Sequence, residues 1–341
     1  MGGGSDRHVW LDNARGIGII LVVYAHQMRA QALIGNIPGS WGGSPQDVLI
    51  YSFHMPLFFF ISGIVSYRSL QSKASSEYFI DKLKTIAYPY ILWSLISWCL
   101  SALAVRYVNR PMDFRSLIFI GYQPILQYWF LYILFLCQVL SLMLKKIFMM
   151  NISLACIFLV IPIASLNPTI KEFLMSFPFF VVGLVMSGLL LATTDGGLAR
   201  WTIPVALFAL MMFTGLTYVR LAGTVFPQWA ALAQAWAGIA VVVMVSQCIG
   251  QRCSRLSALG RASMAIFVMH TIVAAAIRTS LAAVDLHHPA VMLVTCVAGG
   301  LIIPLIVFRA AARYGLEAWF GLGKPGRSQA AAGRATASAV P

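Results

Sequence analysis

The chain has 341 residues, of which 60% are hydrophobic and only 10% are charged, whereas a soluble domain typically carries about 25% charged residues. So few polar side chains cannot cover a water-facing surface, which excludes a soluble enzyme, a disordered chain and a nucleic-acid-binding domain as first interpretations. A net charge of +14 could indicate a protein that binds nucleic acid. In a membrane protein, basic loops on the cytoplasmic side explain the same charge more simply. The composition therefore predicts an all-α, polytopic integral membrane protein.

Apolar segments of spanning length follow one another along the chain, since a transmembrane helix needs about 20 mostly apolar residues. We expect about ten transmembrane helices, near residues 14–34, 48–67, 86–105, 126–144, 150–166, 173–193, 201–219, 229–249, 259–281 and 290–309. If the chain starts inside, 17 of the 24 Lys and Arg residues lie inside and 7 outside. This asymmetry predicts that both termini are cytoplasmic.

The domain organisation follows from the same pattern. Residues 1–320 are expected to form one transmembrane domain, and residues 321–341, which are rich in Gly, Ala and Ser, a disordered cytoplasmic tail. The loop that holds Arg106, Arg110 and Arg115 is the exception to the basic-inside pattern. We interpret it as a re-entrant or surface segment that meets an anionic partner.

Three histidines lie inside predicted spans at a similar depth. At a rise of 1.5 Å per residue, His26 and His270 lie roughly 18 Å and 17 Å from the cytoplasmic ends of their helices. His54 lies roughly 9 Å from the external end of its own helix, which leaves about 21 Å of a 30 Å core below it. A single membrane histidine is often only an interhelical hydrogen-bonding group, but three at one level favour a shared polar cavity.

The first predicted span carries the sharpest pattern. Arg15 and His26 are 11 residues apart, which at about 100° per residue is roughly 20° past three turns, so both lie on one helix face about 16 Å apart. Asp12 precedes Arg15 by three residues and can pair with it, or it can be the N-cap of the helix. Arg15 alone could be a cytoplasmic topology signal, but the aligned His26 then needs a separate explanation.

Further polar residues carry weaker signals. Ser62 is followed by a glycine, which suits helix packing, and no acidic residue lies at a useful spacing for a catalytic triad. Lys82 and Lys84 either set the topology or bind an anionic ligand. Ser263 precedes His270 by seven residues and shares its face, again with helix packing as the alternative. No cluster of Cys and His has the spacing of zinc ligands, so no metal is expected.

Proline and tryptophan add two local expectations. Pro56 lies two residues after His54 in the second predicted span and should kink it, because proline frees a backbone carbonyl. Trp129 lies near the start of the fourth predicted span and is expected at the membrane interface, where tryptophan is enriched.

These residues together resemble the acyltransferase-3 family of membrane O-acyltransferases, in particular its bacterial exopolysaccharide branch. The resemblance covers roughly residues 8–310 and depends on the order of several short motifs. They are Leu11-Asp12-x-x-Arg15-Gly16, Arg15-x10-His26, Phe53-His54-Met55-Pro56-Leu57-Phe58-Phe59, Phe60-x-Ser62-Gly63, Lys82 and Lys84 before Pro89-Tyr90, Trp129-Phe130-Leu131, and Gly260-x-x-Ser263 leading to His270.

The resemblance implies a multi-pass enzyme of the bacterial inner (cytoplasmic) membrane. It would transfer an acyl group, usually acetyl from acetyl-CoA, to a sugar hydroxyl of an exopolysaccharide, another cell-surface glycan or a lipid-linked precursor. By this resemblance, the family's Arg and His map to Arg15 and His26. Many members have an Arg-x-x-Arg motif where this chain has Lys82-Leu83-Lys84, and lysine keeps the charge but loses bidentate phosphate geometry.

A mechanism can be expected from these residues. His26 would take the proton of the sugar hydroxyl as a general base, since neutral imidazole suits this near pH 7. Arg15, oriented by Asp12, would hold a phosphate or the pantetheine arm of CoA. His54 and His270 would line the acceptor side or hold His26 in one tautomer. An acyl-histidine intermediate is equally compatible with the sequence.

Two other classes of function remain open at this point. A transporter or flippase of a lipid-linked glycan would also use mid-membrane ionisable groups and proline-broken helices, although the two halves of the chain show no matching pattern. A non-catalytic subunit of a polysaccharide-assembly complex would tolerate loss of Arg15 and His26. The expected partners are acyl-CoA, the glycan acceptor and the lipid bilayer, with no role for nucleic acid.

Overall fold

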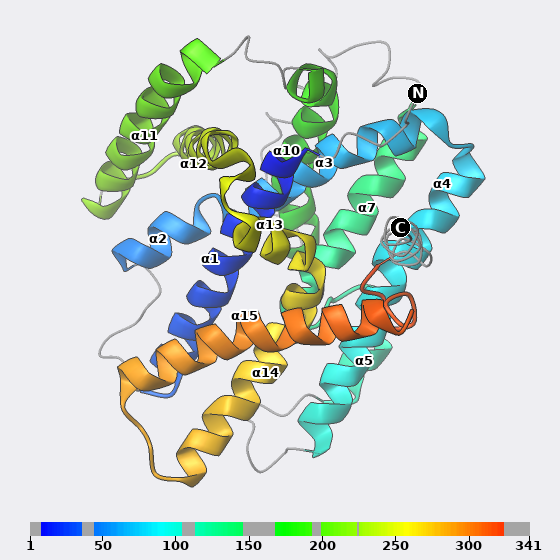
Figure 1. The fold of residues 1–341 in the computed structure, drawn as a ribbon, viewed down its shortest axis with the longest axis vertical. Helices are drawn as coiled ribbons and strands as arrows, with labels where there is room; N and C mark the ends of the chain where they lie inside the picture. The colour runs from blue at the N-terminus through cyan, green and yellow to red at the C-terminus, as the bar shows by residue number, and fades with distance from the viewer. Residues whose placement is uncertain are drawn as a thin grey trace, which may run out of the picture.

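The computed structural model describes residues 8–35, 44–103, 113–145, 168–192, 199–223 and 225–323. Every regular element in these ranges is a helix (Figure 1). In chain order they are α1 (Val9–Leu33), α2 (Pro45–Tyr51), α3 (His54–Ser72), α4 (Ser75–Lys82), η1 (Leu83–Ala87), α5 (Tyr88–Leu103), α6 (Arg115–Ile118), η2 (Leu126–Tyr128), α7 (Trp129–Met143), α10 (Pro168–Ala192), α11 (Ala199–Leu221), α12 (Gln228–Ile249), η3 (Gly250–Arg252), α13 (Ser254–Arg261), α14 (Ser263–Ala283) and α15 (Pro289–Arg313).

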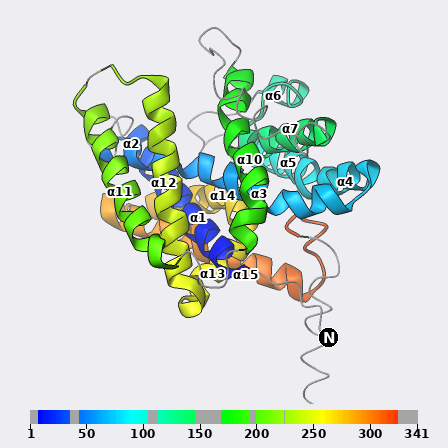
Figure 2. The same cartoon turned by 90° about the horizontal axis from the view of Figure 1, so that it is seen from above.

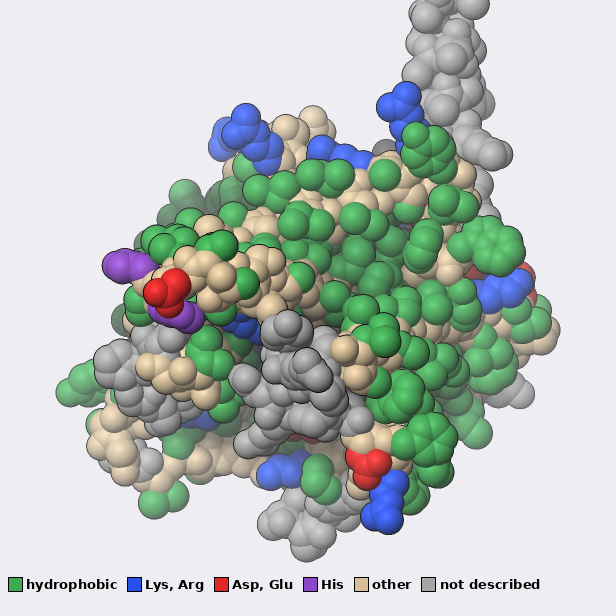
Figure 3. Space-filling model, turned by 90° about the horizontal axis from the view of Figure 1, so that it is seen from below, with side chains coloured by type: hydrophobic (Ala, Val, Ile, Leu, Met, Phe, Trp, Pro, Cys, Tyr) green, Lys and Arg blue, Asp and Glu red, His purple; other side chains and the backbone are tan. Residues whose placement is uncertain are grey.

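Eight helical segments of the described residues are long and apolar enough to cross a membrane, which confirms an all-α, polytopic membrane protein. They are Pro45–Ser72, Ser75–Leu103, Leu126–Met143, Pro168–Leu191, Ile203–Leu221, Gln228–Arg252, Ser263–Ala283 and Pro289–Arg313. Figure 3 shows one face of the molecule covered largely by hydrophobic side chains, as expected of a surface that meets lipid.

Two of the ten predicted spans are not among these eight. The predicted span 150–166 lies outside the described residues. The predicted span 14–34 corresponds to α1, which is 25 residues long but is less apolar because it carries several charged and amide side chains. It packs against α3, α12, α13, α14 and α15, and Figure 2 shows it in the middle of the bundle. Other helices therefore shield much of this polar helix from lipid.

The second predicted span is broken rather than smoothly kinked. α2 ends at Tyr51, and α3 starts afresh at His54. Pro56 is the third residue of α3, in the first turn, where a missing backbone N–H costs least. The helix is therefore interrupted near Pro56, as expected, but by the start of a new helix rather than by a kink. His54 lies at the N-terminus of this new helix, α3.

Close contact between α3 and α10 depends on two glycines. A Cβ added at Gly63 would overlap the carbonyl oxygen of Phe180, and one added at Gly183 would overlap the carbonyl oxygen of Phe60. These two helices make the most extensive helix–helix contact among the described elements. The Phe60-x-Ser62-Gly63 motif thus positions a helix crossing, in agreement with the packing alternative that its sequence left open.

The loop predicted to be re-entrant is described only in part. Arg106 and Arg110 lie outside the described residues, whereas Arg115 begins the four-residue helix α6. Near the other end of the described chain, residues 314–323 fold back against α5, where the hydroxyl of Tyr88 donates to the carbonyl of Trp319 at 2.6 Å. The predicted tail 321–341 starts in this segment, and residues 324–341 lie outside the described residues.

Contacts between helix ends define two ends of the bundle. The start of α1 lies beside η3 and α13, and the end of α1 lies beside α2 and the start of α15. The first group is the end of the bundle that the Lys and Arg distribution predicts to be cytoplasmic, and the second is the predicted external end. The terms cytoplasmic end and external end are used below in this sense.

Candidate active site

Two of the three mid-membrane histidines meet in the centre of the bundle. His26 lies on α1 and His270 on α14, and Nδ1 of His26 is 3.2 Å from Nε2 of His270. Their ring centroids are 5.1 Å apart. Gly300 of α15 lies against His270, since a Cβ at Gly300 would be 3.6 Å from the Cβ of His270. The shared depth predicted for His26 and His270 therefore corresponds to a direct contact.

Backbone carbonyls determine the tautomers of this pair. Nδ1 of His270 lies 3.0 Å and 2.8 Å from the carbonyl oxygens of Ile266 and Phe267. A carbonyl oxygen only accepts hydrogen bonds, so Nδ1 of His270 carries the hydrogen. In the neutral ring, Nε2 of His270 is then an acceptor, and Nδ1–H of His26 donates to it. This arrangement leaves Nε2 of His26 with a free lone pair.

The histidines differ in their accessibility. His270 is 0% exposed and His54 is 1% exposed, whereas His26 is half-buried. Among the three, His26 is thus the most exposed ring. Its accessible, unprotonated nitrogen is the group that a general base or a nucleophile requires.

His54 occupies the start of α3 on the external side of the pair. Its Nδ1–H donates to the carbonyl of Ile50 at 2.8 Å, and its ring packs edge-on against Tyr51 with centroids 4.7 Å apart. Nε2 of His54 is buried and has no hydrogen-bond partner among the described residues. His54 is also close enough to His26 for electrostatic interaction. A buried acceptor of this kind can be satisfied by a water or by a ligand hydroxyl.

Arg15 and Asp12 form the predicted pair near the cytoplasmic end of α1. Nη1 of Arg15 is 3.8 Å from Oδ1 of Asp12, with side-chain exposures of 27% and 6%. The alternative that Asp12 is the N-cap is wrong, because α1 begins at Val9 and its N-cap is His8. α1 runs without a break from Arg15 to His26, so the separation of about 16 Å along one face holds.

The surroundings of Arg15 are tightly packed. A Cβ at Gly16 would overlap the carbonyl oxygen of Leu256, and a Cβ at Gly260 would overlap the carbonyl oxygen of Asp12. α13 therefore lies directly on the first turns of α1. The amide of Asn13 also donates to the carbonyl of Gly250 at 2.7 Å, which holds α1 against the end of α12.

Three arginines that sequence reasoning counted only as topology signals lie on the elements that pack against the start of α1. Arg252 belongs to η3, and Arg255 and Arg261 belong to α13. Arg252 donates to the carbonyl of Cys248 at 3.2 Å, and Arg261 donates to the hydroxyl of Ser257 at 3.2 Å. With Arg15 they make this end of the site strongly positive, which suits a polyphosphate ligand. The presence of three arginines within residues 252–261 is the sequence signal that could have indicated this positive region.

The two lysines of the third predicted span lie on a different part of the bundle. Lys82 ends α4, where its ammonium is 4.9 Å from the ring centroid of Tyr78. Lys84 is exposed within the π-helical turn η1. Both elements pack against α7. The structure thus places Lys82 and Lys84 beside α7, on elements other than those that pack around Arg15.

The two predicted serines lie on helices of the site. Ser62 is half-buried on α3 beside the crossing with α10, and Ser263 is the half-buried first residue of α14. Ser263 is two helical turns from His270 on the same helix, as its spacing indicated. Among the contacts described, neither serine hydroxyl is bonded to a carboxylate, as a catalytic triad would require.

A polar network on the external side of His26 was not predicted. Arg29 makes a bidentate ion pair with Asp47, at 2.8 Å and 3.0 Å, and its guanidinium carbon lies 3.2 Å from the ring centroid of Tyr51. Arg278 of α14 donates to the side-chain oxygen of Gln27 at 2.7 Å. These bonds fix the external end of α1 to α2 and α14, and so they fix the position of His26 along the bundle.

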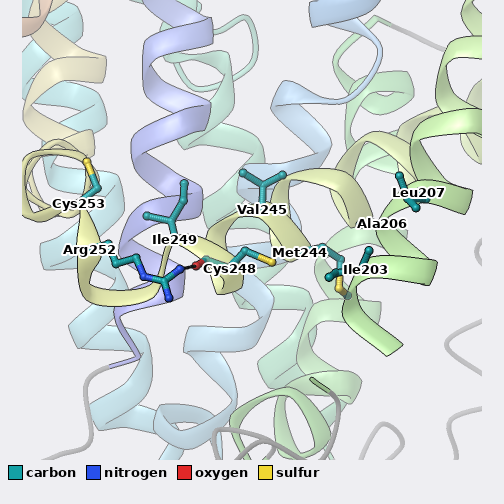
Figure 4. A pocket seen from close by; sticks show the side chains of 9 residues that line it. All are labelled: Ile203, Ala206, Leu207, Met244, Val245, Cys248, Ile249, Arg252 and Cys253. Carbon is teal, nitrogen blue, oxygen red and sulfur yellow. Dashed lines mark hydrogen bonds between the residues drawn. The ribbon is translucent and has the colours of Figure 1, made fainter. Parts of the chain in front are cut away.

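A cavity separate from the histidine pair lies elsewhere in the bundle. It has a volume of about 480 Å³ and lies between α11 and α12, as Figure 4 shows. Its walls are almost entirely apolar, with Arg252 at one end donating to the carbonyl of Cys248. A groove without polar groups at its base cannot orient a thioester and a sugar. The histidine pair, rather than this groove, is therefore the candidate active site.

Comparison with known proteins agrees with this geometry. A family model described as an acyltransferase domain (Acyl_transf_3) matches residues 8–309. The nodulation protein NolL of Mesorhizobium japonicum is 27% identical over 191 residues, which is 54% of this chain and 49% of that protein. NolL of Sinorhizobium fredii is 25% identical over 191 residues, 54% of this chain and 50% of that protein.

The chain thus spans about half the length of these curated relatives. No solved structure matches it. The family model, in contrast, covers almost all of the described bundle, including Arg15, His26 and His270. The chain therefore belongs to the acyltransferase-3 family, and its described helices are those of a polytopic membrane protein.

Proposed function

We propose that the protein transfers an acetyl group from acetyl-CoA to a sugar hydroxyl of an exopolysaccharide, another cell-surface glycan or a lipid-linked precursor, in the inner membrane of a bacterium. The observation that carries the proposal is the accessible Nε2 of His26, which is backed by His270 and aligned with Arg15 on one helix face. The family supports acyl transfer, and the choice of donor and acceptor depends on the site.

The donor enters from the cytoplasmic end in this proposal. The phosphates of acetyl-CoA contact Arg15 and the arginines of η3 and α13, where charge-assisted hydrogen bonds are strongest. The separation of about 16 Å between Arg15 and His26 then accommodates an extended pantetheine arm. Asp12 keeps the guanidinium of Arg15 in place. The thioester arrives beside His26 at mid-membrane depth.

The chemical step uses Nε2 of His26. It takes the proton of the sugar hydroxyl while the sugar oxygen attacks the thioester carbon. The tetrahedral intermediate collapses with cleavage of the carbon–sulfur bond, and the CoA sulfur receives the proton from His26. The products are the acetyl ester and CoA–SH. His270 accepts the Nδ1–H of His26 throughout and stabilises the imidazolium, since a hydrogen bond to a charged group is stronger than one between neutral groups.

A variant of this step uses the same nitrogen as a nucleophile. Nε2 of His26 would attack the thioester carbon and expel the CoA thiolate. The sugar hydroxyl would then attack the acetyl group on His26 and give its proton to the thiolate, so that the acetyl ester, CoA–SH and neutral His26 result. His54 contributes to either version as an acceptor-side contact, because its buried Nε2 can accept from a sugar hydroxyl. A rapid acid quench followed by mass spectrometry of the peptide that contains His26 distinguishes the two versions, since only the nucleophilic one adds an acetyl group.

The experiment that tests the proposal uses purified protein in detergent, labelled acetyl-CoA and a de-O-acetylated glycan from the producing strain. We expect label in base-labile glycan esters, with no ion gradient present. A transporter or flippase of a lipid-linked glycan would move its cargo in sealed vesicles but would form no ester in detergent. Absence of ester formation, with glycan transport in vesicles, would reject the acetyltransferase.

A further inference from the structure

A second, smaller crevice opens at the predicted external end of the bundle, between the starts of α7 and α10. Its volume is about 320 Å³, near the lower limit of small-molecule sites and large enough for a short piece of a chain-like ligand. It is lined by Gln123, Pro124, Leu126, Trp129, Ile133, Pro168, Thr169 and Glu172. Its polar and apolar groups are mixed, unlike those of the groove between α11 and α12.

The lining has the chemistry that recognises a sugar. Trp129 is half-buried and offers a flat apolar face, which packs against the C–H face of a pyranose ring. Glu172 and Gln123 are exposed at the same crevice and can accept from or donate to the hydroxyls at the ring edge. An interfacial tryptophan alone would need neither polar group.

The wall of the crevice is held in an unusual backbone conformation. Leu126 has a φ of 49°, a left-handed conformation that is uncommon for leucine and occurs preferentially at sites that clamp ligands. The side chains of the two residues that follow it anchor this turn to α14. The amide of Gln127 donates to the hydroxyl of Thr271 at 2.7 Å, and the hydroxyl of Tyr128 donates to the carbonyl of Val268 at 3.0 Å.

These bonds connect the crevice to the candidate active site. Thr271 and Val268 flank His270 on α14, and His270 contacts His26 on another side of the same helix. The short helix η2 therefore lies between the crevice on one side and the turn that carries His270 on the other. A glycan bound in the crevice would be separated from His26 by η2 and by the turn of α14 that carries His270.

We propose that this crevice binds a sugar residue of the acceptor glycan, with Trp129 as the stacking platform and Glu172 and Gln123 as hydroxyl contacts. This inference rests on the proposed function and extends it. The acceptor enters from the external end, opposite to the Arg15 end where the donor binds. The acetyl group thus crosses the bilayer within the bundle, from the cytoplasmic thioester to an external hydroxyl.

The test measures binding and turnover separately. Purified full-length protein is dialysed against labelled, de-O-acetylated oligosaccharides cut from the surface polysaccharide of the producing strain, without acetyl-CoA. We expect Trp129→Ala and Glu172→Gln to weaken binding by about tenfold each, the order of one lost contact to a charged or fully packed group. Trp129→Phe, which keeps a ring, should retain most of the affinity.

Matched controls exclude general effects. Trp229→Ala removes an exposed tryptophan near the start of α12, and Asp285→Asn removes an exposed carboxylate outside the crevice. Both controls should bind the oligosaccharides like the parent. The hydrolysis of acetyl-CoA by water should also be unchanged in Trp129→Ala and Glu172→Gln, because the donor site is at the other end of the bundle. Unchanged hydrolysis also shows that the variants fold.

The outcomes separate the two proposals. Parent affinity in Trp129→Ala and Glu172→Gln, or no oligosaccharide binding by the parent, overturns the crevice assignment even if ester formation is observed. Weakened binding in both variants, with no ester formed by the parent, supports the crevice as a glycan site and overturns the acetyltransferase. Weakened binding together with an increased KM for the glycan, at an unchanged KM for acetyl-CoA, supports both.

Discussion

The hydrogen bond between His26 and His270 predicts a graded loss of activity when His270 is replaced. His270→Phe preserves a ring of similar size but removes the nitrogen that accepts from Nδ1–H of His26. A hydrogen bond between neutral groups contributes about 1 kcal/mol, and one to a charged group about 1.5–3 kcal/mol. Because His26 becomes charged only during the reaction, the difference of about 0.5–2 kcal/mol favours the transition state.

At 1.36 kcal/mol per factor of ten, this difference corresponds to a decrease in kcat of roughly 2- to 30-fold. The KM for acetyl-CoA should not change, since His270 is fully buried and does not reach the ligand. His270→Gln should recover part of the rate, because the glutamine side-chain oxygen can occupy a position close to that of Nε2 and accept from His26.

The assay is ester formation with saturating acetyl-CoA, using proteins matched for amount and for thermal unfolding temperature. Parent activity in His270→Phe would refute the assignment of His270 as a positioning residue. A loss as large as that of His26→Ala would refute it in the opposite direction, because His270 would then take part in the proton transfer directly.

Three further predictions follow from other contacts. Arg15→Ala should raise the KM for acetyl-CoA by about tenfold or more, because a charge-assisted contact to phosphate is lost. Arg15→Lys, which keeps the charge, should have an intermediate KM. An unchanged KM in Arg15→Ala would place the donor elsewhere. Gly63→Ala should lower the unfolding temperature, since its Cβ would overlap the carbonyl of Phe180 and overpacking costs about 1–3 kcal/mol. The matched helical change Gly215→Ala, where a Cβ meets open space, should be neutral or stabilising, and equal effects of the two changes would contradict the packing described. Arg29→Ala should destabilise the fold by about 1–3 kcal/mol, because it removes two charge-assisted hydrogen bonds to the buried Asp47 carboxylate. Adding Asp47→Asn should restore part of that loss in the same thermal assay.

The sequence predicted best those features that depend on one helix. Arg15 and His26 share a face because a single unbroken helix connects them, and helical periodicity is enough to show this. The pairing of Arg15 with Asp12 is local in the same way. The disturbance at Pro56 was foreseen because it follows from the covalent structure of proline, although the break into α2 and α3 depends on how the flanking segments pack.

Contacts between distant segments could be predicted less well from the sequence. Depth estimates placed His26 and His270 at one level, but the rotation of α14 that brings their nitrogens together depends on packing against α1 and α15. The bond between Gln127 and Thr271 joins segments 144 residues apart, and no local pattern indicates it. Likewise, the basic residues of α13 were assigned to topology because only the fold shows that α13 lies on the start of α1.

The central claim is that Nε2 of His26 performs the proton transfer or the nucleophilic attack. The most direct test is the rate of ester formation by purified His26→Ala at matched folding, with saturating acetyl-CoA and glycan. The account predicts a decrease in kcat of about a hundredfold or more, the usual contribution of a positioned base. Ester formation by His26→Ala at the parent rate would contradict it.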